Sequence, residues 1–395
     1  MCSKVKTGSA LRSANTEKNN SLRAHISPIH YYDHRIFDRE RRAIFSDSWT
    51  FAGLTSQVSR PDDYFLTDVG GTNMIVQNFE GELKAFVNSC SHRHSRIHSE
   101  QCGNRKLVCP YHGWAYDNNG IPAGIREKDN FPDVLADPTS FGLRRFDLDC
   151  AGSFIFLRNS TTGQTLQEFL GHTWDFLLKV SDSLDRKLDS FEVAVAANWK
   201  VVVENAVESY HVPMVHRSTF AALNNYGKDE DDMVDELPAT NGHSRMTHKV
   251  NDDFRARWKE YELDIGSWPF RFEHYCHQLI FPNLAISSIL GHSFHITRFR
   301  PDSAGQTTIE LQSYAPRFEL QTHRGAEIMA SIHDLAARFN RKVIDEDKRI
   351  CEQAFLGCQQ AGRPAVLAND FEQRVAHFQQ NYLDTMGKEG DARKA

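Results

Sequence analysis

The chain has 395 residues, of which 40% are hydrophobic and 25% are charged. This length and composition are typical of a globular protein with two or three domains, and a small electron carrier would need only about a third of it. The formal net charge of −6 at pH 7 provides no strongly basic balance of the kind that binds nucleic acids or anionic membranes. We therefore expect no nucleic-acid partner and no membrane partner.

The first 48 residues are predicted to form a tail and a helix that packs on the C-terminal domain. Residues 1–27 are polar and rich in Ser, Asn and Lys, which is typical of a mobile tail. Apolar side chains recur at helical spacing in residues 33–48, which predicts the helix. The start of the chain lacks the apolar segment of a secretory signal, and no run approaches ~18 apolar residues, so we predict a cytoplasmic protein.

Residues 49–158 are predicted to form a small antiparallel β domain. Short runs rich in aliphatic and aromatic side chains, such as residues 64–66, 74–76 and 84–87, are separated by turns that contain glycine. This alternation is typical of strands joined by hairpins.

The predicted β domain carries two pairs of metal-binding residue types, Cys90 with His92 and Cys109 with His112. They form a C-x-H motif and a C-x-x-H motif that sixteen residues separate. Two thiolates on one iron and two imidazoles on the other suit a Rieske 2Fe–2S cluster. Structural zinc fingers instead place two cysteines in one motif and two histidines in the next. We predict a Rieske cluster with these four ligands and keep a structural zinc site as the alternative.

Residues 159–395 are predicted to form a second, larger domain, in which helices cover an antiparallel sheet. Strand-like segments at residues 278–281 and 308–312 follow helical patterns, and residues 327–358 and 371–384 predict two further helices. Together with the β domain, this pattern predicts an α+β fold.

A helix near the start of this domain carries a second group of polar residues. Asn205, Glu208 and His211 recur every three residues and would share one face of the helix. Pro213 is expected to end the helix, so that the chain turns and brings His216 close to His211. Two histidines in such a pattern are, by themselves, more often core residues than metal ligands.

A carboxylate in the long helix changes that interpretation. Apolar residues recur at helical spacing along residues 327–358, and Asp347 falls on the same stripe as Leu335 and Ile350. A carboxylate on a buried stripe costs several kcal/mol unless it is paired or bound to a metal. Asp347 is therefore expected to have a partner from another part of the chain.

Two imidazoles and one carboxylate form the facial triad of non-heme Fe(II) oxygenases. We therefore predict that His211, His216 and Asp347 bind a mononuclear Fe(II), and Asp345 is the competing choice for the carboxylate. An open side of such an iron accepts dioxygen and substrate.

Both groups of ligands, in this order, resemble those of the α subunits of Rieske non-heme iron aromatic-ring-hydroxylating oxygenases. The resemblance extends from about residue 30 to 385; residues 109–114 resemble the second cluster loop of that family, and Glu346-Asp347 resembles its ligand pair. His94 departs from the pattern, because the family usually has Gly at this position.

The resemblance implies partners and a route for electrons. NAD(P)H would supply the electrons through a separate flavin reductase, a ferredoxin or both. The spacing from Asn205 to Glu208 resembles that of monooxygenase and demethylase members that form α3 trimers, so a homotrimer is implied, with or without a β subunit. His112 of one chain would meet Glu208 of the next, and Glu208 would contact His211. Asn205 is expected either near the iron or hydrogen-bonded within its helix.

The resemblance implies a small organic substrate besides dioxygen, with an aromatic compound as the first choice because such substrates dominate the family. A quaternary ammonium compound of the choline, carnitine or betaine type is the second choice. Two other classes stay open, an electron-transfer Rieske protein without catalytic iron and a zinc-stabilised binding module. The substrate pocket is expected between residues 214–223 and strands with aromatic side chains, although such side chains more often belong to a core. These side chains are Trp268, Phe270, Phe272, Phe281 and Phe294.

Overall fold

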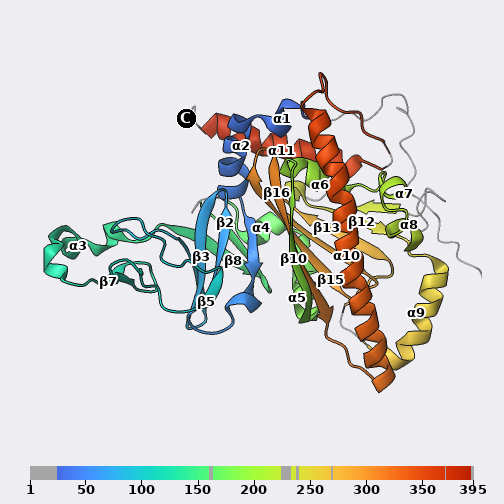
Figure 1. Ribbon diagram of the computed structural model, residues 1–395, viewed down its shortest axis with the longest axis horizontal. Coiled ribbons are helices and arrows are strands. Elements are labelled where there is room, and N and C mark those ends of the chain that lie inside the picture. Colours follow the sequence, from blue (N-terminus) through green and yellow to red (C-terminus); the bar gives the residue numbers. More distant parts are fainter. Residues whose placement is uncertain are drawn as a thin grey trace, which may run out of the picture.

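The computed structural model describes residues 25–159, 163–223, 233–236, 240–267, 270–369 and 371–392. Nearly all of the predicted tail and Trp268 lie outside these residues. Two seven-stranded antiparallel sheets and the helices around them form the α+β fold that the sequence predicts (Figure 1).

The first sheet has the strand order β1-β9-β8-β4-β3-β2-β5, and all of its pairs are antiparallel. The predicted runs at residues 64–66, 74–76 and 84–87 fall in β2, β3 and β4. A small hairpin and the helix α3 lie at the far left end of the molecule in Figure 1. The strands are β1 (Thr50–Leu54), β2 (Asp63–Val69), β3 (Thr72–Phe79), β4 (Glu82–Val87), β5 (Cys102–Asn104), β8 (Arg145–Ala151) and β9 (Phe154–Arg158), the hairpin is β6 (Ala115–Tyr116) with β7 (Pro122–Gly124), and the helical segments are η2 (Thr55–Val58), η3 (Lys128–Asn130), α3 (Pro132–Ala136) and η4 (Pro138–Phe141).

The second sheet has the strand order β10-β16-β15-β14-β13-β12-β11. The predicted segment at residues 278–281 falls mainly in β13, and the predicted segment at residues 308–312 falls entirely in β16. Its strands are β10 (Leu184–Val195), β11 (Met233–Glu236), β12 (Ser244–His248), β13 (Tyr275–Ile280), β14 (Leu284–Ile289), β15 (Phe294–Ser303) and β16 (Gln306–Pro316).

Helices surround the second sheet, and the long helix α10 crosses in front of it in Figure 1. The predicted helices at residues 327–358 and 371–384 are α10 and α11, each longer than expected. These helical segments are α4 (Leu166–Leu170), α5 (Thr173–Ser183), α6 (Trp199–Val207), α7 (Val212–Val215), α8 (Phe220–Leu223), η6 (Thr240–Gly242), α9 (Asp252–Ile265), α10 (His323–Cys358) and α11 (Gln373–Ala392). Among the residues that the structure describes, no helix combines the length and apolar character needed to cross a bilayer.

The helix predicted for residues 33–48 is divided. After the short α1 (Ile29–Tyr32), Asp33 caps α2 (His34–Glu40) by accepting hydrogen bonds from the backbone N–H groups of Arg35 and Ile36, and a π-helical segment η1 (Arg41–Ser46) follows. The helix α2 and the segment η1 pack beside α11, as the upper part of Figure 1 shows.

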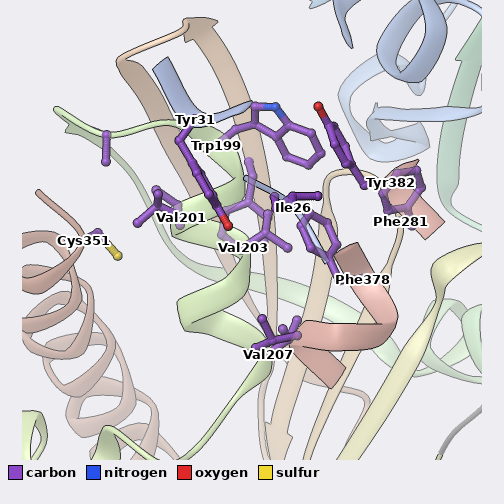
Figure 2. Close-up of a cluster of buried hydrophobic side chains, with 14 of the residues drawn as sticks. Ile26, Tyr31, Trp199, Val201, Val203, Val207, Phe281, Cys351, Phe378 and Tyr382 are labelled. Atoms are coloured by element: carbon purple, nitrogen blue, oxygen red, sulfur yellow. The ribbon is translucent and has the colours of Figure 1, made fainter. Parts of the chain in front are cut away.

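A buried ion pair joins this N-terminal segment to α6. The Nζ of Lys200 lies 2.6 Å from Glu40, and both side chains are fully buried. Trp199 Nε1 and the Tyr382 hydroxyl also donate to Glu40, each over 2.8 Å. Asn198 caps α6 by accepting from the backbone N–H of Lys200. The Asn-Trp-Lys segment therefore starts α6 and fastens it to α2, and Figure 2 shows the Trp199 ring beside Tyr382 and Phe378.

The buried face of α10 differs from the predicted stripe. Leu335 is 61% exposed and Ile350 is 40% exposed, so both predictions of burial are wrong. Val343 and Cys351 are buried, and Asp347 lies between them at i+4 from Val343. Asp347 thus faces the protein interior, as expected. The buried face of α10, however, contains Val343 and Cys351 and not Leu335 and Ile350, because the face with Val343 and Cys351 is the one that packs on the rest of the domain.

Candidate metal centres and substrate cavity

The four predicted cluster ligands come together from two loops. Cys90 and Cys109 are buried, and their thiol groups contact each other. The rings of His92 and His112 lie 4.6 Å apart between centroids. His112 is exposed at the surface. The arrangement places the two thiols inside, His112 at the surface and His92 partly buried.

The surroundings of these loops fit an iron–sulfur cluster. The backbone N–H of Cys90 donates to the Ser95 carbonyl over 2.9 Å, and a hydrogen bond over 3.0 Å links the Cys90 sulfur to the Tyr116 hydroxyl. His92 stacks on Trp114 with an interplanar angle of 5°. Within the described residues, the buried Nδ1 of His92 has no hydrogen-bond partner. An unpaired buried nitrogen is costly unless it binds a metal, so it fits an iron ligand.

His94 explains why the family usually has Gly at this position. Its φ is +59°, in the left-handed region that glycine adopts without steric cost. Its backbone N–H donates to the Cys90 carbonyl over 2.9 Å, which closes the loop around the ligands. The side chain is exposed, so the departure changes the backbone energy of the loop and leaves the ligand set intact.

His211, His216 and Asp347 form a second group, and one ligand atom from each lies within 4.8 Å of the others. His216 Nε2 is 2.9 Å and His211 Nε2 is 3.6 Å from the same Asp347 oxygen. His211 and His216 flank α7, and Asp347 comes from α10. Two imidazole nitrogens and a carboxylate therefore converge on one point, as a metal site requires.

The local structure around His211 corrects the prediction of one continuous helix. α6 ends at Val207, and Glu208 is extended, with φ −120° and ψ 168°. The Glu208 carboxylate accepts hydrogen bonds from the backbone N–H groups of Tyr210 and His211, which competes with continuation of the helix. Pro213 lies in the first turn of α7, where proline is favoured. Asn205, Glu208 and His211 therefore do not share the face of one helix.

A carboxylate stands behind each histidine. Glu208 is hydrogen-bonded to Nδ1 of His211, and Glu346 accepts from Nδ1 of His216 over 2.8 Å. Glu346 also accepts from the Thr219 hydroxyl over 2.8 Å. These bonds place the proton on Nδ1 and leave the Nε2 lone pair for a metal. No contact between Glu346 and His216 was predicted from the sequence. The signal for a role was its place beside Asp347 in the pair that resembles the family's ligand pair.

The remaining candidates separate clearly. Asn205 donates from Nδ2 to Asp347 over 2.8 Å, so it lies at the triad, which was one of its two predicted placements. Asp345 is exposed and pairs with Arg349 over 2.5 Å. The competing carboxylate therefore points away from the two histidines.

The charges of the triad depend on one another. Burial raises the pKa of Asp347, but hydrogen bonds from His211 and His216 outweigh it and hold that pKa well below its usual value. Burial lowers the pKa of His211, but Asp347 and Glu208 outweigh burial and raise it to about 9. Without a metal, protons on His211 and His216 therefore face the Asp347 carboxylate at the point where a cation would bind.

The triad lines a cavity of about 110 Å³. The candidate aromatic wall residues that the structure describes lie in hydrophobic cores, which the sequence analysis gave as the more frequent placement. Phe270, Phe272 and Phe294 pack in the core under β14 and β15, and Phe281 packs in a second core near α6. Met214, in the expected segment, is 68% exposed. The aromatic side chains that do line the cavity are Phe220, Tyr275 and Phe299.

Comparison with known families identifies both halves of the chain. Residues 48–137 match the Rieske [2Fe-2S] domain, and residues 181–388, more than half of the chain, match the ring hydroxylating alpha subunit (catalytic domain). The chain belongs to the family of ring-hydroxylating α subunits. It is an oxygenase with a Rieske 2Fe–2S cluster and a mononuclear iron, and α subunits of this family form multimers and receive electrons from NAD(P)H through a reductase or ferredoxin. This excludes the zinc module and the electron carrier without catalytic iron.

The proteins similar to this α subunit include some named for an aromatic substrate and some named for a quaternary ammonium substrate. It is 27% identical over 329 residues to the 2-halobenzoate 1,2-dioxygenase large subunit of Burkholderia cepacia, with 75% of this chain and 70% of that protein covered. It is 31% identical over 205 residues to the glycine betaine monooxygenase oxygenase subunit of Chromohalobacter salexigens, covering 51% and 45%. The fold is similar to the quaternary ammonium Rieske monooxygenase CntA in complex with L-carnitine, with TM-score 0.73, 20% identity, and 93% and 95% of the two chains covered.

Proposed function

We propose that this α subunit is a terminal oxygenase that hydroxylates or oxidatively demethylates a small organic molecule, in first place an aromatic compound. His211, His216 and Asp347 bind the mononuclear iron in this proposal. The observation that carries it is the convergence of two Nε2 atoms and one carboxylate on the wall of a cavity. The iron, when bound, supplies the site at which dioxygen is activated beside the substrate.

The side chains around the triad orient it. Glu208 and Glu346 fix the rings of His211 and His216 through Nδ1, so both lone pairs point at one place. Asn205 donates to Asp347 and thereby restrains the carboxylate. Apolar side chains, which cover most of the exposed cavity wall, exclude water around the substrate.

We further propose that electrons cross between subunits of a homotrimer, with or without a β subunit. Cys90, His92, Cys109 and His112 hold the Rieske cluster in this proposal. His92 packs against Phe131, next to α3, and Figure 1 places α3 far from α7 and α10. Such a separation within one chain favours transfer from a neighbouring chain. We place the cluster unit at residues 49–158, the catalytic unit at residues 159–395 and the protein in the cytoplasm.

Glu208 is reachable from the side away from the iron. It lines the substrate cavity and also a second cavity of about 420 Å³ beside α1, α6 and α10. A carboxylate between the two cavities suits a bridge from the His112 of a neighbouring chain to His211.

A quaternary ammonium substrate is the second candidate function. Phe220 and Tyr275 lie 5.4 Å apart between ring centroids at the cavity, and aromatic faces of this kind attract methylammonium groups. The glycine betaine and carnitine enzymes among the similar proteins agree with this candidate.

The proposal is tested with the loaded enzyme and a surrogate reductase. Substrate-dependent oxygen uptake and ¹⁸O incorporation are measured across aromatic compounds and methylammonium compounds. Asp347→Ala is expected to lose about one iron of three and all hydroxylation while the Rieske absorption persists, because the triad has no spare ligand. Asp345→Ala is the matched control and should stay active. The opposite pattern would move the ligand to Asp345.

The bridge is tested by complementation. Mixed trimers are prepared from a chain with His92 replaced and a chain with Asp347 replaced. They should regain activity that neither parent has. No recovery in preparations verified to contain mixed trimers would favour transfer within one chain.

A further inference from the structure

A row of four cross-strand neighbours, three of them polar, runs across the sheet at the substrate cavity. Met246 on β12, His277 on β13, Ser287 on β14 and His295 on β15 are direct cross-strand partners in sequence. Met246, His277 and Ser287 line the cavity that the iron triad also lines. Residues next to the row on the same faces, such as Leu279, are apolar core side chains. Polar side chains in such surroundings, such as the buried His277, are costly unless they have partners.

His277 has a defined hydrogen-bonding direction. Its Nδ1 lies 3.3 Å from Nη2 of Arg374, and a guanidinium has donors only, so Nδ1 must accept. Burial and then the charge of Arg374 lower the pKa of His277 to about 3, so the ring is neutral. A neutral imidazole has one N–H, which is therefore on Nε2. Because His277 lines the cavity, this N–H is the donor that a substrate meets.

Ser287 supplies a second donor. Its side chain lines the cavity beside His277, and the structure gives its hydroxyl no hydrogen bond to any described residue. The neighbouring Ser288, by contrast, donates to the Ser293 carbonyl over 2.6 Å. Two donors on adjacent strands thus point to an acceptor from outside the chain.

Arg374 places a buried positive charge directly behind His277. It is fully buried, and its guanidinium contacts the backbone oxygens of Val207 and Ser244 as well as His277. A buried cation that acts through a polarised imidazole attracts an anion and repels a cation. Glu208 and Asp347 also line this cavity, but their carboxylates are bonded to the triad histidines.

We propose that the substrate carries a carboxylate, which accepts hydrogen bonds from His277 and Ser287 at the end of the cavity near Arg374. This inference rests on the proposed oxygenase function and deepens it, because it names a group that either substrate candidate must carry. Benzoate has that group and toluene lacks it. Glycine betaine has it and choline lacks it. A site built to hydrogen-bond a substrate group discriminates strongly against the analogue that lacks this group.

Binding and turnover are measured separately for these four probes. Calorimetry on the loaded enzyme without reductase measures binding, and oxygen uptake with reductase measures kcat/KM. The probes form two pairs, benzoate with toluene and glycine betaine with choline. In one of these pairs we expect the probe with the carboxylate to bind at least tenfold more tightly than the probe without it. Binding of the acid without turnover of any probe would refute the proposed function alone. Equal binding within both pairs, or tighter binding of toluene or choline, would overturn the carboxylate proposal alone.

Variants assign the preference to the two donors. His277→Phe should lower kcat/KM for the preferred acid by about 10–100-fold, the value of one hydrogen bond to a charged acceptor, with less than a threefold change for its partner probe. His277→Gln keeps an N–H donor and should restore most of the ratio. Ser287→Ala, which is less disruptive to folding, should lower the ratio by about tenfold. Ser288→Ala is the matched control on the same strand and should leave it unchanged. An unchanged ratio in both Ser287→Ala and His277→Phe would overturn the assignment. If His277→Phe cannot be measured, an unchanged ratio in Ser287→Ala is enough to overturn it.

Discussion

Glu346 offers the sharpest test of how the iron site is built, because its contacts are few and its neighbour Asp345 provides a control. One Glu346 oxygen accepts from His216 Nδ1 and from the Thr219 hydroxyl, each over 2.8 Å. Its side chain is 16% exposed, so the solvent replaces this carboxylate poorly. We expect Glu346→Ala to leave His216, the proposed iron ligand, without its orienting partner.

The expected loss follows from that contact. A hydrogen bond to a charged group contributes about 1.5–3 kcal/mol, which is about 10–100-fold in an equilibrium constant. Removal of a carboxylate behind a metal-binding histidine weakens metal affinity by a similar factor. Glu346→Gln retains an acceptor oxygen without the charge and should fall between wild type and Glu346→Ala.

Iron affinity is measured by competition with a chelator, and the Rieske absorption reports whether the rest of the chain is intact. Asp345→Ala removes the carboxylate of the preceding residue. That carboxylate pairs only with Arg349 at the surface. This control should bind iron as wild type does. The reasoning fails if Glu346→Ala binds iron within twofold of wild type while Asp345→Ala is normal.

Three further outcomes follow from the structure. Lys200→Met should lower the free energy of unfolding by about 3–5 kcal/mol, because it leaves the fully buried Glu40 uncompensated, and the double variant with Glu40→Gln should recover part of the loss in thermal unfolding. Since the pKa of His211 is raised to about 9, iron must displace a proton below that pH, and apparent affinity in chelator titrations should rise up to about tenfold per unit from pH 7 to 8. A flat profile would contradict this. His94→Gly should raise the free energy of unfolding of the cluster unit by about 0.5–1 kcal/mol, because His94 has a φ of +59° and Gly adopts it freely; equal stability in calorimetry would argue against strain there.

The cluster motif and the strands around it could be predicted because their information is local. Cys90 and His92 are two residues apart, and a turn that closes by a hydrogen bond from His94 to Cys90 is short. The hairpins of β2, β3 and β4 depend on alternation and glycine turns, which are visible in the sequence. No distant partner decides these features.

The predictions that failed depended on partners far along the chain. α6 ends at Val207 because the Glu208 side chain takes the backbone N–H groups of the next turn, which periodicity does not reveal. The role of Glu346 requires His216, which is 130 residues away in the sequence. The cavity walls depend on which face of each strand the helices cover, so Phe294 enters the core whereas Tyr275 meets the cavity.

The hydrogen-bond capacity of Glu208 bears on the proposed bridge between subunits. A carboxylate has about four lone-pair positions, two on each oxygen. One oxygen of Glu208 accepts from the backbone N–H groups of Tyr210 and His211, and the other is bonded to Nδ1 of His211. The second oxygen therefore retains one acceptor position. Val207, directly before it, is held through its carbonyl by Arg374 over 3.1 Å, so the backbone that carries the carboxylate is fixed from the other side. A rigid carboxylate with one remaining acceptor position suits a single imidazole N–H from a neighbouring chain, because a second donor would have to displace a bond that positions His211.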